Sequence, residues 1–124
     1  MASIELTAKN FGEHIEKDGI TIVDFWAEWC GPCRQFGPVF ESASNLHPEI
    51  TFGKVNTEVE RDLADEANIT SIPNLMIFRD GILVYNRPGS MPAAGFEELI
   101  VAVQGLNMEA VRKEIAEQES KVEG

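Results

Sequence analysis

Residues 20–33 read ITIVDFWAEWCGPC, and they contain the only two cysteines of the 124-residue chain. The segment from Ile20 to Ala27 is apolar and rich in β-branched side chains, which predicts a buried strand. Gly31-Pro32 interrupts that strand and opens a helical pattern that continues to about Asn45. A strand, a Cys-x-x-Cys pair and the start of a helix, in this order, are typical of a dithiol redox site.

The spacing of Cys30 and Cys33 suits a disulfide that forms and breaks easily. Residues at i and i+3 of a helix have Cβ atoms about 5–6 Å apart, and a disulfide needs about 3.5–4.5 Å. Cys30 is placed at the helix N-terminus, where unpaired N–H groups favour an anion, so we expect its thiol pKa to lie below the usual value of about 8.5. Cys33, one turn further on, is expected to be more buried and less acidic. We therefore predict that Cys30 attacks and that Cys33 resolves.

Asp24 places a carboxylate inside the predicted buried strand. An unpaired buried carboxylate costs several kcal/mol, and desolvation raises its pKa. Such a carboxyl group suits the task of taking the proton from Cys33 as a mixed disulfide resolves. The alternative is an edge or bulge position that faces solvent. Lys54, in the next predicted strand, is a candidate partner for Asp24, and a solvent-facing lysine is the alternative there.

The rest of the chain, up to Gly105, alternates strands and helices in the order β-α-β-α-β-α-β-β-α. Long crossovers imply a parallel part of the sheet, and the turn signal Arg79-Asp80-Gly81 adds an antiparallel hairpin. We therefore expect an α/β fold with a central mixed sheet and helices on both of its faces. Besides residues 20–27, the predicted strands are 4–6, 50–56, 75–78 and 82–85, and further helices are predicted after Thr7, over 60–67 and from about Pro92.

A C-terminal extension follows this pattern, so we divide the chain into a domain of residues 1–105 and a helical extension of residues 106–124. Met108, Val111 and Ile115 give the extension a thin apolar stripe, and we expect its end to fray from about Glu119. We predict that the extension packs back on the domain and adds modest stability.

The charge of the chain excludes some classes of partner. Acidic residues outnumber basic ones 21 to 10, the net charge is −11, and Lys and Arg form no cluster. We therefore expect neither nucleic acid nor an anionic membrane as a partner. The amino terminus does not resemble a signal peptide, which predicts a cytoplasmic protein whose cysteine pair is catalytic or metal-binding rather than a permanent crosslink. A metal site is the weakest of these alternatives, because the pair supplies two ligands and a closed zinc site needs four.

Residues 23–34, VDFWAEWCGPCR, followed by Pro38, resemble the active-site signature of the thioredoxin family nearly letter for letter, Gly31 and Pro32 included. The resemblance extends roughly over residues 4–105 and implies the thioredoxin fold, with an extra C-terminal helix in this chain. It also implies a cis peptide bond before Pro73, with Ile72 and Pro73 beside the dithiol. Gly89 matches a family glycine that a bound polypeptide passes closely, and Trp29 is implied to be a partly exposed contact for protein substrates.

The resemblance implies a protein disulfide reductase that needs no bound cofactor and is recharged by a flavin- and NADPH-dependent thioredoxin reductase. We expect a monomer that acts on oxidised protein substrates. Two alternatives remain open: a thiol oxidant or isomerase, and a binding module of the same fold whose dithiol is incidental. One departure from the family concerns the site, because Asn74 stands where the family most often has Thr.

Overall fold

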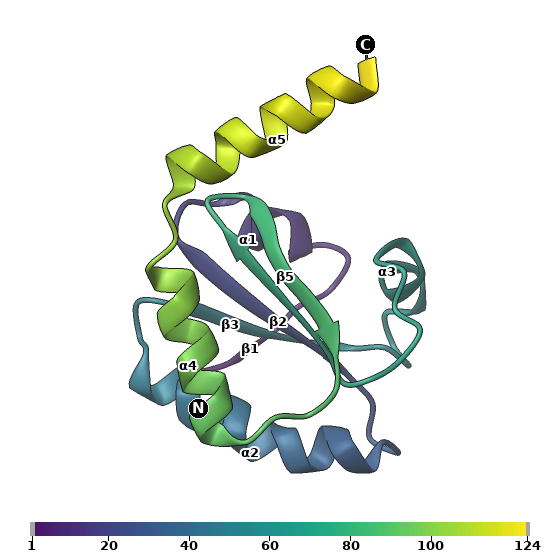
Figure 1. Cartoon of the computed structure of the whole chain (residues 1–124). Coiled ribbons are helices and arrows are strands. Elements are labelled where there is room, and N and C mark those ends of the chain that lie inside the picture. The colour runs from purple at the N-terminus through teal and green to yellow at the C-terminus, as the bar shows by residue number, and fades with distance from the viewer. Residues whose placement is uncertain (1, 124) are drawn as a thin grey trace.

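The computed structural model describes residues 2–123, which form a five-stranded mixed sheet with helices on both faces (Figure 1). The strands lie in the order β1-β3-β2-β4-β5. The first three of these run parallel to one another, and β4 and β5 add the antiparallel part. The predicted order of elements is therefore confirmed. The strands are β1 (Ile4–Glu5), β2 (Ile20–Trp26), β3 (Thr51–Asn56), β4 (Asn74–Arg79) and β5 (Ile82–Pro88).

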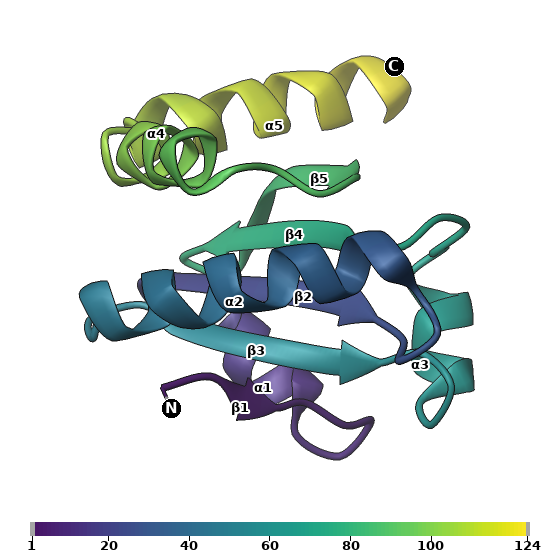
Figure 2. The same cartoon turned by 90° about the horizontal axis from the view of Figure 1, so that it is seen from below.

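Two helices pack on each face of the sheet. On one face, α2 (Gly31–Leu46) and α4 (Ala93–Gln104) cover the larger hydrophobic core. On the other face, α1 (Phe11–Glu16) and α3 (Arg61–Glu66) cover the smaller one (Figures 1 and 2). No helix among residues 2–123 is both long enough and apolar enough to cross a membrane.

Strand β2 is buried on both faces because its side chains alternate between the two cores. Ile22 belongs to the core under α2 and α4, whereas Val23 and Phe25 belong to the opposite core. Every polar residue in the middle of this strand is therefore forced into the interior. Four rings with neighbouring centroids 5.3–6.3 Å apart fill the larger core: Phe36, Phe40, Phe52 and Phe96.

Two glycines have clear structural reasons, a close approach at Gly53 and a positive φ at Gly81. In β3, a Cβ atom on Gly53 would lie 2.6 Å from Cγ of the fully buried Leu6, so only glycine leaves room for that side chain. In the β4–β5 hairpin, Asp80 and Gly81 both have positive φ, 53° and 81°, as the turn signal predicts. Asn68, which ends α3, has a φ of 58°, and this too agrees with the sequence.

The extension forms one long helix, α5 (Met108–Glu123), which runs beside the edge strand β5 (Figure 2). The predicted fraying from about Glu119 is wrong, because the helix continues to Glu123. Its start is capped by Asn107, whose side-chain oxygen accepts the N–H of Ala110 at 3.1 Å. Most residues after the cap are good helix formers, so the helix persists although little of it is buried.

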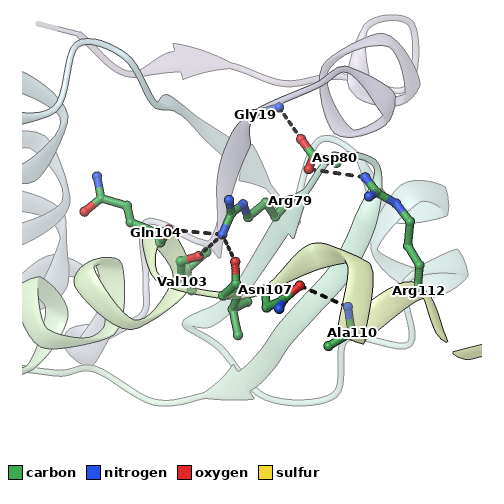
Figure 3. Close-up of polar contacts among 9 residues, drawn as sticks. Gly19, Arg79, Asp80, Val103, Gln104, Asn107, Ala110 and Arg112 are labelled. Atoms are coloured by element: carbon green, nitrogen blue, oxygen red, sulfur yellow. Dashed lines mark hydrogen bonds and ion pairs between the residues drawn. The ribbon is translucent and has the colours of Figure 1, made fainter. Parts of the chain in front are cut away.

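The first turns of α5 are held to the β4–β5 hairpin (Figure 3). Nη1 of Arg79 donates to three backbone carbonyls at the end of α4 and in the following loop, those of Val103 at 2.7 Å, Gln104 at 3.1 Å and Leu106 at 2.9 Å. Arg112 of α5 lies 3.4 Å from a carboxylate oxygen of Asp80. The other oxygen of Asp80 accepts the N–H of Gly19 at 2.9 Å. The start of α5 is thus connected to the β4–β5 turn and, through Asp80, to the residue before β2.

Candidate active site

Cys30 and Cys33 are joined by a disulfide at the N-terminal end of α2. Cys30 precedes the helix with an extended backbone, and Cys33 lies in the first turn, with Cα atoms 5.2 Å apart. The exposed fractions of the two residues are 4% and 3%, so the predicted difference in burial is only marginal. Cys30 is covered because the loop before β4 lies against it: its Sγ is 3.6 Å from the carbonyl oxygen of Ile72.

The loops around the disulfide bring together residues that are far apart in the sequence. The peptide bond between Ile72 and Pro73 is cis, as the family resemblance implies. The carbonyl oxygen of Pro73 accepts the N–H of Gly89 at 2.8 Å, which places the loop after β5 next to the loop before β4. Gly89 has a φ of 110°, and a Cβ atom there would meet nothing within 4 Å. The Cβ side of Gly89 is therefore open, and its backbone is joined to the loop that contacts Cys30.

The N–H group of Cys33 donates to Sγ of Cys30 at a distance of 3.2 Å. Unpaired N–H groups at the first turn of a helix, together with the helix dipole, favour negative charge on the atom that they face. Sγ of Cys30 is therefore the sulfur that faces a backbone donor at the positive end of the helix dipole. Pro32, at the start of α2, removes no intrahelical hydrogen bond, because the N–H at that position has no partner inside the helix.

Asp24 is buried in β2 with an exposed fraction of 1%, as the sequence predicts. Among the described residues, neither of its carboxylate oxygens has a hydrogen-bond partner. Burial raises the pKa of Asp24 to about 7, and the positive charge of Lys54 opposes this rise without cancelling it. Asp24 and Ile22 lie on the same face of the strand, so the carboxyl group lies under α2, the helix that begins with the cysteines.

Lys54, the candidate partner of Asp24, influences the carboxyl group without an ion pair. The two residues are directly opposite each other in the parallel β2–β3 pair, but no contact within 4.0 Å joins their charged groups among residues 2–123. The lysine stem instead carries the ammonium group over the ring of Trp26, with Nζ 4.7 Å from the centroid. Lys54 therefore acts on Asp24 through its charge and not through a hydrogen bond.

Trp29 is the most exposed aromatic residue near the cysteines, with an exposed fraction of 67%. Its indole N–H donates to a carboxylate oxygen of Glu58, in the turn after β3. The second carboxylate oxygen of Glu58 lies 3.4 Å from Arg61 of α3. Glu58 was missed in the sequence because nothing local connects it to a residue 29 positions earlier. It holds the ring of Trp29 beside the disulfide.

Asn74, the departure from the family noted above, is buried, and its side chain has a hydrogen-bond partner. Its side-chain amide donates to the side-chain oxygen of Asn86 at 2.8 Å, across the β4–β5 pair. The substitution therefore has a local partner on the neighbouring strand, and the peptide bond before Pro73 keeps the cis form that the family pattern implies.

Comparisons with known proteins agree with this geometry. The family model described as Thioredoxin matches residues 2–102. A protein of Streptomyces coelicolor named "Putative thioredoxin 2" is 44% identical over 120 residues, 97% of this chain and 90% of that protein, so the match extends into α5. The solved thioredoxin structure of Malassezia sympodialis has a TM-score of 0.73 and 27% identity, over 81% of this chain and 89% of its own. That of Plasmodium falciparum has a TM-score of 0.73 and 30% identity, over 81% and 97%.

Proposed function

The chain belongs to the thioredoxin family, and on that premise we propose that Cys30 attacks a protein disulfide and that Cys33 resolves the resulting mixed disulfide. The protein is a thiol-disulfide oxidoreductase whose redox-active pair is Cys30–Cys33. The pair itself carries the two electrons. The observation that carries the assignment of roles is the 3.2 Å contact from the N–H of Cys33 to Sγ of Cys30.

In the first step, the thiolate of Cys30 attacks one sulfur of the substrate disulfide, forms a mixed disulfide and releases the other sulfur as a thiolate. In the second step, the thiolate of Cys33 attacks Sγ of Cys30 and releases the reduced substrate. We propose that Asp24 accepts the proton of Cys33 before this second step. Its pKa of about 7 suits a base that works near neutral pH, and its place under α2 puts it on the side of the helix that faces the sheet.

We propose that the substrate chain lies in an extended form across Trp29, Ile72, Pro73 and Gly89. The exposed ring of Trp29 offers apolar contact, and the positive φ of Gly89 leaves the backbone there unshielded. Gly31 and Pro32 support the site by fixing the start of α2. Lys54 supports it by limiting the rise in the pKa of Asp24.

The proposed partners are oxidised proteins and a flavin- and NADPH-dependent thioredoxin reductase that restores the dithiol. A supply of reducing equivalents is needed after each turnover, so we propose the cytoplasm as the place of action. We further propose that residues 1–105 carry the redox activity and that residues 106–124 are an extension of that domain. The family match, which covers residues 2–102, supports this division.

Trapping the mixed disulfide tests the two roles. The Cys33→Ser variant, mixed in its reduced form with a disulfide-containing protein, should accumulate a covalent adduct through Cys30 that mass spectrometry identifies. The Cys30→Ser variant is the matched control and should give no adduct. An adduct with Cys30→Ser and none with Cys33→Ser would reverse the assignment. A midpoint potential of the wild-type pair well above the glutathione poise would favour an oxidant or isomerase instead.

A further inference from the structure

Most of α5 has no partner within the described part of the chain. Met108 in its first turn is buried, Val111 is half-buried, and the residues from Arg112 to Lys121 are exposed. Ile115 has an exposed fraction of 36%, although it belongs to the apolar stripe of the helix. The apolar stripe of α5 is thus only partly covered by the rest of the described chain.

A groove separates this stripe from the edge strand β5. It has a volume of about 270 Å³, and its polar lining residues are Glu114 and Gln118. Leu83, on the strand side of the groove, has an exposed fraction of 45%. The apolar side chains that line the groove, from strand and helix together, are Ile82, Leu83, Val84, Leu106, Val111 and Ile115.

The stripe of α5 has the spacing of a coiled-coil seam. Val111, Ile115 and Gln118 are separated by four and three residues, and Val122 continues this series in the sequence, whereas Met108 at the start of the stripe is already buried in its own chain. A seam with this repeat fits best against another helix with the same repeat. The single polar position in this series is Gln118.

The charges beside the seam are complementary to those of a second copy, provided that the two helices run antiparallel. With Ile115 packed next to Gln118 of the other copy, Arg112 faces Glu119, and Glu114 faces Lys121. Each pair occurs twice by symmetry, and all four pairs have opposite charges. In a parallel arrangement Glu114 faces Glu119 instead, which is repulsive. The charge pattern therefore selects a second copy and one orientation.

We propose that the groove between β5 and α5 is an interface at which two copies of this chain associate, with their α5 helices antiparallel. The association is weak, because each copy has a net charge of −11 and exposed ion pairs contribute little, so the proposal departs from the expected monomer only at high protein concentration. It leaves the redox site open, because α5 and the helix that carries the cysteines, α2, lie on opposite sides of the molecule in Figure 1.

Sedimentation equilibrium of the full chain, from about 10 μM to about 1 mM, tests the proposal. The wild type should approach twice the mass of one chain, 13.7 kDa, at the upper end. Arg112 is already paired with Asp80, so the test uses the other pair of charges. Glu114→Lys and Lys121→Glu should each weaken the self-association about tenfold, because each change makes two pairs repulsive. An equal mixture of these two variants should associate again, because their charges complement each other.

The direction in which Glu114→Lys changes the self-association distinguishes specific charge pairing from a general effect of net charge. Glu114→Lys brings the chain closer to neutrality, so general repulsion alone predicts stronger association for this variant. Glu117→Lys is the matched control: it changes the charge equally at an exposed position outside the seam and should not weaken the association. Stronger association of Glu114→Lys, or no recovery in the mixture, would overturn the proposal. A wild type with the mass of one chain at every concentration would also overturn it, and would leave the groove to another protein.

Discussion

Replacing Asp24 by Asn is expected to stabilise the oxidised protein at neutral and alkaline pH, by an amount that grows as the pH rises. The carboxyl group is 1% exposed, it has no hydrogen-bond partner among the described residues, and its pKa is raised from 3.8 to about 7. A side chain of nearly the same shape that cannot ionise removes the cost of burying the charge.

The sign and size of the contribution of Asp24 to the free energy of unfolding follow from its pKa values in the folded and unfolded chain. Between pH 3.8 and about 7, the folded protein keeps a proton on Asp24 that the unfolded chain releases. Unfolding then releases a proton, so this group makes the wild type less stable as the pH rises. Its favourable contribution is fully present below pH 3.8 and is lost at about pH 7. A difference of about three pKa units corresponds to about 4 kcal/mol. The Asp24→Asn variant has no such slope at this position.

The assay is urea unfolding of the oxidised wild type and of the Asp24→Asn variant at several pH values and constant ionic strength. The free energy of unfolding of the variant minus that of the wild type should increase by about 4 kcal/mol between about pH 4 and pH 8. Asp62→Asn, at an exposed carboxylate of α3, is the matched control for the loss of one negative charge. Parallel curves for wild type and Asp24→Asn would refute the reasoning, whatever the offset between them.

Two further predictions concern packing. Gly53→Ala should lower the free energy of unfolding by about 1–3 kcal/mol in a urea titration, because the new methyl group would lie 2.6 Å from Cγ of Leu6; an unchanged midpoint would show that Leu6 moves freely. Deleting residues 106–124 should lower the melting temperature, because it removes the buried Met108, worth about 2 kcal/mol, and the ion pair between Arg112 and Asp80. An unchanged melting temperature would contradict the prediction that the extension adds stability.

Local patterns were sufficient for the parts of the site that depend on neighbours in the sequence. The cysteines lie where a strand gives way to a helix, and this is visible as a change of pattern at Gly31-Pro32. The burial of Asp24 follows from apolar residues on both sides of it. The left-handed residue Asn68 likewise lies at the end of a helical pattern. The cis bond before Pro73 came only from the family resemblance, because the residues themselves do not distinguish the two isomers.

Contacts between distant segments could not be predicted in this way. The strand register places Lys54 opposite Asp24, which agrees with the predicted neighbourhood, but the path of the long lysine stem to Trp26 depends on the space left by packing. The bond from Trp29 to Glu58 depends on how the turn after β3 folds back. The end of α5 was predicted too early, because exposed charged residues were taken as a sign of fraying although they are good helix formers.

The three hydrogen bonds from Arg79 to the backbone carbonyls before α5 determine how mechanical force would pass through the molecule. A pull on α5 reaches the domain at the hairpin, through the three carbonyls that Arg79 binds and through the ion pair of Arg112 with Asp80. In the β2–β4 pair, Arg79 lies opposite Ile20, the first residue of β2, whereas the cysteines follow the last residue of that strand. A force applied to α5 therefore acts at the end of the sheet that is away from the disulfide. A protein tethered by α5 would keep its dithiol free of tension until the hairpin separates.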